Sequence, residues 1–358
     1  MKRVSATMMS GLLFGVVMLV AVAGRADAQG AGTPYPLRVS QQPQRWALAW
    51  YVAGKKGWWE KVGLQATMAT FASGAPQVAA GAAGSWDVGA AGSIPSVLGG
   101  SRYNLLTIAI ADEEAAINTI MATKDKADEY SKNHALLKGR TIPVPFNSTG
   151  HWGAKICMEK KFGLAPSDYT FVNLSPSEIN AAISSGRYDV TEAWAPNTYQ
   201  LEATIGARVI CNGKDVGLPI TSNLFANPQF AKEHPDIVAK FLAVYLRAIA
   251  WERAHPKEAE RYLGEFYKSN GVNIPEKYLA QEMHDRPAFT LQEQLKMLKG
   301  SESGTSEVAK WMDQVAEFMK SVGTLTKVPE AKDYVTDKFL LMVANNPTLK
   351  KFAEDSSD

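Results

Sequence analysis

The stretch LLKGRTIPVPFNSTGHWGAKICMEKKFGL, residues 136–164, contains the unit that decides the fold class. Its first half predicts a strand over 139–145, and its second half predicts a helix over 150–164. Small polar residues and a glycine lie between the two, directly before the helix. This order of strand, polar turn and helix is typical of α/β proteins whose strands pair in parallel.

The same order recurs on both sides of this stretch, so that strands and helices alternate in two sets. The first set has a predicted helix within 45–64 that ends at or shortly after Gly57, and further helices at 74–85 and 94–100. Its predicted strands are 36–41, 64–72, 86–92 and 104–111. The second set has predicted helices at 150–164 and 176–186 and strands at 117–123, 139–145, 169–174, 187–194 and 206–213. Two such sets predict two α/β lobes.

One further strand is predicted at 220–227, and from Pro228 the chain is almost entirely amphipathic helix. Apolar residues recur there at three- and four-residue spacing, which is typical of helices that pack on a core. We therefore expect lobe one to contain 37–112 plus 219–358, including a helical C-terminal extension, and lobe two to contain 113–215. Two crossings would join the lobes.

The N-terminus has the form of a secretory signal peptide. Lys2 and Arg3 precede the apolar run GLLFGVVMLVAVAG, and Ala26-Asp27-Ala28 is a small-x-small sequence that predicts cleavage before Gln29. The alternative is an uncleaved anchor helix, which the shortness of the apolar run disfavours. We therefore expect residues 1–28 to be removed and the mature chain to be exported.

Charge excludes one class of function. Removing residues 1–28 takes three of the 38 basic residues and one of the 36 acidic residues, so 35 of each remain. A neutral chain lacks the basic face of a general nucleic-acid binder. We expect no nucleic-acid partner.

Two cysteines, Cys157 and Cys211, make up the whole thiol content. An oxidising compartment permits a disulfide between them, but two separate buried thiols fit the sequence equally well. Two residues cannot by themselves provide the four ligands of a structural zinc site. We expect neither a metal nor a cofactor.

Five segments, taken in order, resemble the periplasmic substrate-binding proteins of ABC importers for sulfonates, taurine and nitrate. They are QQPQRWALAWYVAGKKGWWEKVGL, FASGAPQ, WDVGAAGSIPSVLGG, the 136–164 stretch and INAAISSGRYDVTEAWAP. That family is similar to the thiamine-pyrimidine-precursor binding proteins, and the resemblance covers roughly 35–270. It implies a two-lobe, type II-like periplasmic binding protein that closes on a small molecule. It also implies permease and ATPase partners, and we expect a monomer.

Polar turns at strand ends are the first candidates for the ligand site. A helix N-terminus leaves backbone N–H groups unpaired and favours negative charge. The turn of Ser148, Thr149, Gly150 and His151 can therefore hold a carboxylate, sulfonate or nitrate, although Ser148 or Thr149 alternatively only caps the helix. Similar turns follow other strands, whose carboxyl ends face the cleft in open α/β sheets; their residues are Ser73, Gly74, Gly92 and Ser93.

Other candidates flank these turns. Gln41, Gln42, Gln44 and Trp46 occupy the first strand–helix turn, where Trp46 either stacks on a ligand or packs in the core. Glu113 and Glu114 follow a crossing strand and either take an ammonium group or lie on the hinge surface. The returning strand offers Asn223. The resemblance implies that the loop with Glu192 and Trp194 closes on the ligand.

Three functional alternatives follow from the sequence. Catalysis by Ser148 and His151 is disfavoured, because no G-x-S-x-G elbow surrounds the serine. A sensory binding protein and a transport protein cannot be separated by sequence. The acidic candidates oppose a dianion and tolerate a zwitterion, so a taurine-like solute is favoured over nitrate. The tryptophans leave an aromatic acid or a pyrimidine as the alternative ligand.

Overall fold

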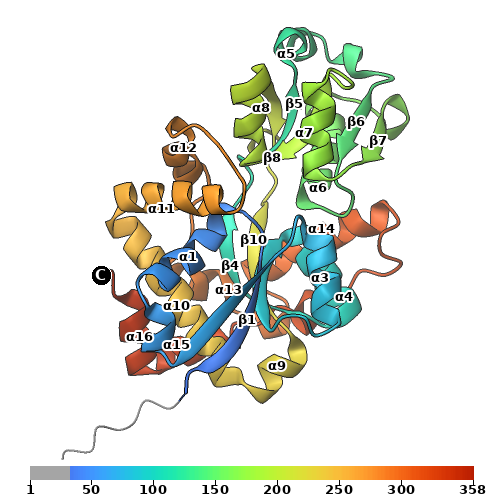
Figure 1. Ribbon diagram of the computed structural model, residues 1–358. Coiled ribbons are helices and arrows are strands. Elements are labelled where there is room, and N and C mark those ends of the chain that lie inside the picture. The colour runs from blue at the N-terminus through green and yellow to red at the C-terminus, as the bar shows by residue number, and fades with distance from the viewer. Residues whose placement is uncertain (1–32) are drawn as a thin grey trace, which may run out of the picture. The chain divides into compact units, whose positions relative to one another are not determined.

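The computed structural model describes residues 33–358, and the predicted signal peptide and its cleavage site lie outside them. Residues 34–358 form one compact unit. Within it, the strands of the described residues form a five-stranded sheet in one lobe and two smaller sheets in the other (Figure 1). The exact lobe boundaries given above stay a prediction.

The large lobe is built on a sheet with the strand order β2-β1-β3-β10-β4. Strand β1 pairs in parallel with β2 and β3, whereas β10 is antiparallel to both β3 and β4. The bounds are β1 Tyr35–Gln41, β2 Leu64–Thr70, β3 Val88–Gly92, β4 Leu106–Glu113 and β10 Thr221–Ala226.

The small lobe contains an antiparallel sheet of order β8-β5-β9 and a parallel pair, β6 with β7. The bounds are β5 Asn118–Ala122, β6 Thr141–Val144, β7 Thr170–Asn173, β8 Val190–Trp194 and β9 Arg208–Asn212. Its helices are α5 Lys124–Lys132, α6 Thr149–Ile156, α7 Pro176–Ser184 and α8 Asn197–Ile205.

The prediction of parallel pairing, made for the two alternating sets, is therefore right for β1, β2, β3, β6 and β7. It is wrong for β4, which pairs with antiparallel β10, and for β5, β8 and β9, since β5 pairs antiparallel with both β8 and β9. Parallel neighbours need a connection that carries the chain back to the starting end of the same sheet. Strands β5 and β10 are each entered directly from the other lobe, without such a return. Each therefore runs against its neighbours.

The helices of the large lobe cover both faces of its sheet. The N-terminal ones are α1 Leu48–Lys55, α2 Trp58–Lys61, α3 Gly74–Ala82 and α4 Ser93–Tyr103. The first helix is predicted to end at or shortly after Gly57, and α1 ends just before it, at Lys55, because Gly57 adopts a left-handed backbone conformation with φ 65°. The short helix α2 that follows is not predicted. The C-terminal helices are α9 Pro228–Glu233, α10 Pro235–Ala254, α11 Pro256–Ser269, α12 Lys277–Asp285, α13 Leu291–Leu298, α14 Glu307–Ser321, α15 Lys338–Asn345 and α16 Pro347–Glu354.

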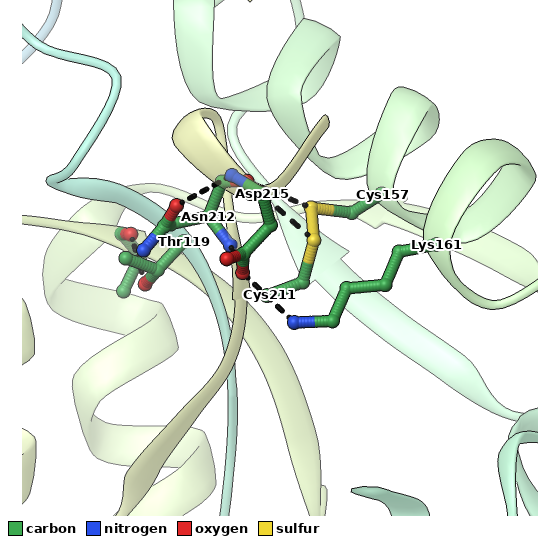
Figure 2. The surroundings of a disulfide bond; sticks show 7 residues. Thr119, Cys157, Lys161, Cys211, Asn212 and Asp215 are labelled. Atoms are coloured by element: carbon green, nitrogen blue, oxygen red, sulfur yellow. Dashed lines mark hydrogen bonds and ion pairs between the residues drawn. A yellow bond between two sulfur atoms is a disulfide. The ribbon is translucent and has the colours of Figure 1, made fainter. Parts of the chain in front are cut away.

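A disulfide joins Cys157 to Cys211, which decides between the two alternatives left open by the sequence. Cys157 begins a π-helical turn, Cys157–Lys161, that continues α6, and Cys211 lies in β9. Figure 2 shows that the bond lies beside the exit of the chain from the small lobe, where Asn212 and Asp215 cap each other and Lys161 pairs with Asp215 at 2.8 Å. The disulfide therefore ties α6 to the start of the return crossing.

Candidate ligand-binding site

A cavity of about 40 Å³ lies between polar turns of the two lobes. A water molecule needs about 10–15 Å³ measured this way, so the cavity holds a few waters or a small group. Its lining residues come from both lobes; they are Gln42, Gln44, Trp46, Gly74, Gly92, Pro95, Glu114, Asn118, Ser148, Thr149, Gly150, Trp194 and Ser222.

Three helices of the described residues begin at this cavity. Gly74 is the first residue of α3, Gly92 is the N-cap of α4, and Thr149 and Gly150 are the first two residues of α6. Each helix N-terminus carries unpaired backbone N–H groups and a partial positive charge. Their convergence makes the cavity favourable for an anionic group.

Ten of the candidates named from sequence lie in the lining: Gln42, Gln44, Trp46, Gly74, Gly92, Glu114, Ser148, Thr149, Gly150 and Trp194. Seven others lie outside it: Gln41, Ser73, Ser93, Glu113, His151, Glu192 and Asn223. The lining contains Glu114 and not Glu113, and Ser222 and not Asn223. Neighbouring residues differ in this way because successive strand residues point to opposite faces. Asn223 is fully buried and donates to Ser96 Oγ at 3.2 Å.

Ser148 acts as a helix cap. Its hydroxyl accepts the backbone N–H of His151 at 3.0 Å and donates to the carbonyl of Pro145 at 2.6 Å. The hydroxyl group thus already acts both as a hydrogen-bond acceptor and as a hydrogen-bond donor within the protein. Thr149 is different, because its Oγ1 accepts the backbone N–H of Ile94 in α4 at 3.4 Å and so joins the two lobes.

Glycine is required at two positions where backbones and side chains of the lining meet. A Cβ on Gly92 would clash with Thr149 Oγ1 and lie 3.1 Å from Thr149 Cβ. A Cβ on Gly150 would clash with the carboxyl group of Glu192. The close approach of α4, α6 and β8 therefore depends on the missing side chains.

Glu114 is the one charged residue in the lining as far as the structure describes the chain. Its Oε1 pairs with Arg286, the residue that follows α12. The same guanidinium donates from Nη1 to the side chain of Gln44 at 2.9 Å. Arg286 could not be identified from the sequence, because it lies 172 residues from Glu114 and 242 residues from Gln44.

Glu192 lies behind the α6 turn and is fully buried. Neither of its carboxyl oxygens has a hydrogen-bond partner among the described residues. Burial raises the pKa of Glu192 well above its ordinary value, so the neutral acid is favoured. With Trp194 it lines a second, smaller cavity whose other residues are Pro145, Pro176, Ile179, Asn180, Ala193 and Asn197.

His151 points away from the cavity into aromatic side chains. Its ring stacks on Phe146 at 5.0 Å between centroids and meets the edge of Phe318 of α14 at 5.9 Å. Helix α14 thus lies beside α6 (Figure 1). Burial, and secondarily Lys155, lower the pKa of His151 to about 4. The neutral imidazole therefore forms part of a contact between the lobes.

A second contact between the lobes lies on α8 and α12. Tyr199 stacks on Tyr278 with 4.8 Å between ring centroids. Gln200 donates to the carbonyl of Asn273 at 3.4 Å. The helical C-terminal extension therefore contacts the small lobe through both α12 and α14.

None of the groupings of His, Cys, Asp and Glu in residues 33–358 has three or more members placed to hold a metal ion. Among the helices of the same residues, none has both the length and the apolar character needed to cross a membrane.

Comparisons with known proteins place this geometry in a family. A family described as NMT1/THI5 like matches residues 47–259. A putative aliphatic sulfonates-binding protein of Bacillus subtilis (strain 168) is 25% identical over 335 residues, covering 92% of this chain and 94% of that protein. The taurine-binding periplasmic protein of Escherichia coli (strain K12) is 27% identical over 322 residues, covering 88% and 94%.

A solved structure shares the fold. The periplasmic aliphatic sulphonate binding protein SsuA from Escherichia coli superimposes with a TM-score of 0.69 at 21% identity, covering 85% of this chain and 92% of that one. The predicted two-lobe periplasmic-binding-protein fold is confirmed by this likeness.

Proposed function

The chain belongs to the NMT1/THI5 like family, and from this premise we propose that it is the extracytoplasmic solute-binding component of an ABC importer. It captures a small organic anion or zwitterion between its lobes and delivers it to permease and ATPase subunits. The observation that carries the proposal is the convergence of three helix N-termini on one small cavity. Backbone N–H groups there bind the anionic end of the solute.

The lining favours a taurine-like or sulfonate-like solute. Sulfonate and taurine are named for two of the similar proteins. The carboxylate of Glu114 disfavours a dianion and accepts a cationic group, so a zwitterion fits better than nitrate. An aromatic acid or pyrimidine is the second candidate, because Trp194 and Trp46 lie in the lining. Trp46, however, is only 1% exposed and packs on Trp50.

Binding is favoured over catalysis by the positions of Ser148 and His151. The serine hydroxyl contacts the backbone N–H of His151, while the imidazole lies among aromatic rings. The two side chains are therefore not arranged as nucleophile and base, which would require a hydrogen bond between them. We also propose that residues 1–28 are removed and that the mature protein lies in the periplasm.

The test is a thermal-shift screen of residues 29–358, followed by calorimetry. Taurine, 1-propanesulfonate, nitrate, amino acids, benzenesulfonate and a pyrimidine are compared at equal ionic strength. A solute at 100 times its Kd stabilises the protein by about 2.7 kcal/mol. We expect a small sulfonate or zwitterion to give the largest shift. If no anion or zwitterion raises the melting temperature, the proposed function is wrong.

A further inference from the structure

Arg286 is a fully buried arginine in the helical C-terminal extension. It lies beyond residues 47–259, the part of the chain that the family matches. Its guanidinium contacts four side chains from three segments of the chain, namely Gln44, Asp112 with Glu114, and Glu282. A planar guanidinium with several donors fixes the orientation of its partners in a way that a lysine cannot.

Two of these partners line the cavity and two do not. Gln44 and Glu114 are in the lining, whereas Asp112 and Glu282 are fully buried behind it. Arg286 Nε lies 3.1 Å from Asp112 Oδ2, and Nη1 lies 3.0 Å from Glu282 Oε1. The arginine therefore connects the floor of the cavity to the buried interior of the large lobe.

The free oxygen of Glu114 faces the ligand turns. Its Oε1 is held by Arg286, while its Oε2 lies 3.9 Å from the position that a Cβ on Gly92 would take. Gly92 in turn touches Thr149 of α6. Glu114 Oε2 is thus directed toward the meeting point of α4 and α6.

The charge balance of the cluster leaves room for a cation. One guanidinium is shared by three carboxyl groups, those of Asp112, Glu114 and Glu282. Burial raises the pKa of Asp112 despite the opposing effects of Arg286 and Arg45, which favours the neutral form of this carboxyl group. The single guanidinium then still faces two further carboxyl groups, those of Glu114 and Glu282. A buried charge cluster commonly adds little net stability, because the cost of desolvation offsets the attraction between the charges.

We propose that Arg286 is a positioning residue that holds Gln44 and Glu114 on the cavity floor, so that Glu114 Oε2 binds a cationic group of the solute. The inference rests on the proposed function and narrows it to a zwitterion. The anionic end lies at the helix N-termini, and the ammonium end lies against Glu114.

The experiment measures selectivity, which a purely structural role would not change. Taurine and 1-propanesulfonate have the same length and differ in an ammonium against a methyl group. Calorimetry gives the ratio of their Kd values for the wild type, Arg286→Lys, Glu114→Gln and the double variant. We expect the wild type to prefer taurine at least tenfold and each single variant to lower this ratio to about threefold or less. The double variant should show no further fall, because Arg286 acts through Glu114.

Glu252→Gln is the matched control. Glu252 forms another buried pair with an arginine of the same lobe, Arg45 at 2.8 Å, and neither residue lines the cavity. This variant should lower the melting temperature and leave the ratio unchanged. If Arg286→Lys does not fold, the double variant Arg286→Gln with Asp112→Asn is measured in its place. This double variant removes one charge of each sign from the cluster.

The possible outcomes separate the two proposals. If the wild type binds both sulfonates equally, or Arg286→Lys keeps the wild-type ratio, the role of Arg286 is overturned and the proposed function stands. If neither sulfonate nor any other anion binds, the proposed function fails and the inference fails with it.

Discussion

The side-chain oxygen of Thr149, at the start of α6, accepts a hydrogen bond of 3.4 Å from the backbone N–H of Ile94, at the start of α4. The bond is long and by itself weak. The bond matters because of its position, since it joins two helix N-termini that belong to different lobes. Gly92 makes the approach possible, since any side chain there would meet Thr149.

Gly92→Ala should weaken solute binding about fivefold or more. Its backbone, at φ −60° and ψ 168°, suits alanine, so the substitution acts through the clash with Thr149 rather than through strain at residue 92. Overpacking of this kind costs about 1–3 kcal/mol, which here opposes closure. Calorimetry measures the loss. Adding Thr149→Ala should recover part of the affinity, and unchanged affinity in Gly92→Ala would show that the turns need not meet.

Ser148→Ala should lower stability, whereas Thr149→Ala should lower affinity. Ser148 caps α6, so its loss should lower the free energy of unfolding by about 1 kcal/mol with little change in affinity. Thr149 joins the lobes, so its loss should weaken binding about threefold to tenfold with little effect on stability. Chemical denaturation and calorimetry measure the two quantities. Equal effects of the two variants on affinity would contradict this division of roles.

The parts of the site that the sequence predicts are those with a local signal. The turns at Gly74, Gly92 and Thr149 are marked by small polar residues between a strand and a helix, and all three lie in the lining. The sequence of a strand has no comparable local signal that shows which of its residues face the cavity. The choice between Glu113 and Glu114, or Asn223 and Ser222, depends on which face the sheet buries, and a shift of one residue reverses it.

Contacts between distant segments left no trace in the sequence pattern. Arg286 lies in a segment that reads only as amphipathic helix, and its contact with Gln44 spans 242 residues. The antiparallel direction of β5 and β10 likewise follows from the route of the chain between lobes, not from the residues of either strand. The alternation of strands and helices predicts the two-lobe fold but not these long-range pairings.

Replacing both cysteines by alanine should lower stability without removing the binding site. The disulfide closes a loop with a sequence separation of 54 residues, for which chain entropy predicts about 4 kcal/mol. The expected fall in melting temperature is on the order of 10 °C. Calorimetric scans of the variant and of the wild type with a reductant should agree. An unchanged melting temperature in both would contradict the prediction.

His151 should make stability fall as the pH is lowered. Its pKa is about 4 in the folded protein and 6.5 ordinarily, so the unfolded chain binds the proton first. The stabilisation is fully present above pH 6.5 and is lost as the pH falls toward 4. Between pH 7 and 5 the wild type should lose about 1–2 kcal/mol more than His151→Leu. Urea unfolding at each pH measures the difference, and parallel pH profiles would show that His151 is not buried among the rings.

Glu192 should have the opposite pH dependence. Its folded pKa is raised above the ordinary 4.5, so its stabilisation is full below pH 4.5 and is lost as the pH rises toward the folded pKa. Over that window the unfolded chain releases a proton that the folded protein retains. Glu192→Gln keeps the shape and removes the titration, so its free energy of unfolding should gain about 1.4 kcal/mol per pH unit relative to wild type.

The control for Glu192 is Glu60→Gln, an exposed glutamate of α2, whose pH profile should parallel that of the wild type. Urea unfolding between pH 5 and 8 gives all three profiles. A Glu192→Gln profile parallel to that of the wild type would mean that Glu192 ionises in the folded protein.

Calorimetry of taurine binding in two buffers of different ionisation enthalpy tests whether Glu192 contacts the solute. An ammonium group beside Glu192 would drive off its proton, whereas binding without proton release would leave Glu192 a buried neutral acid behind the α6 turn.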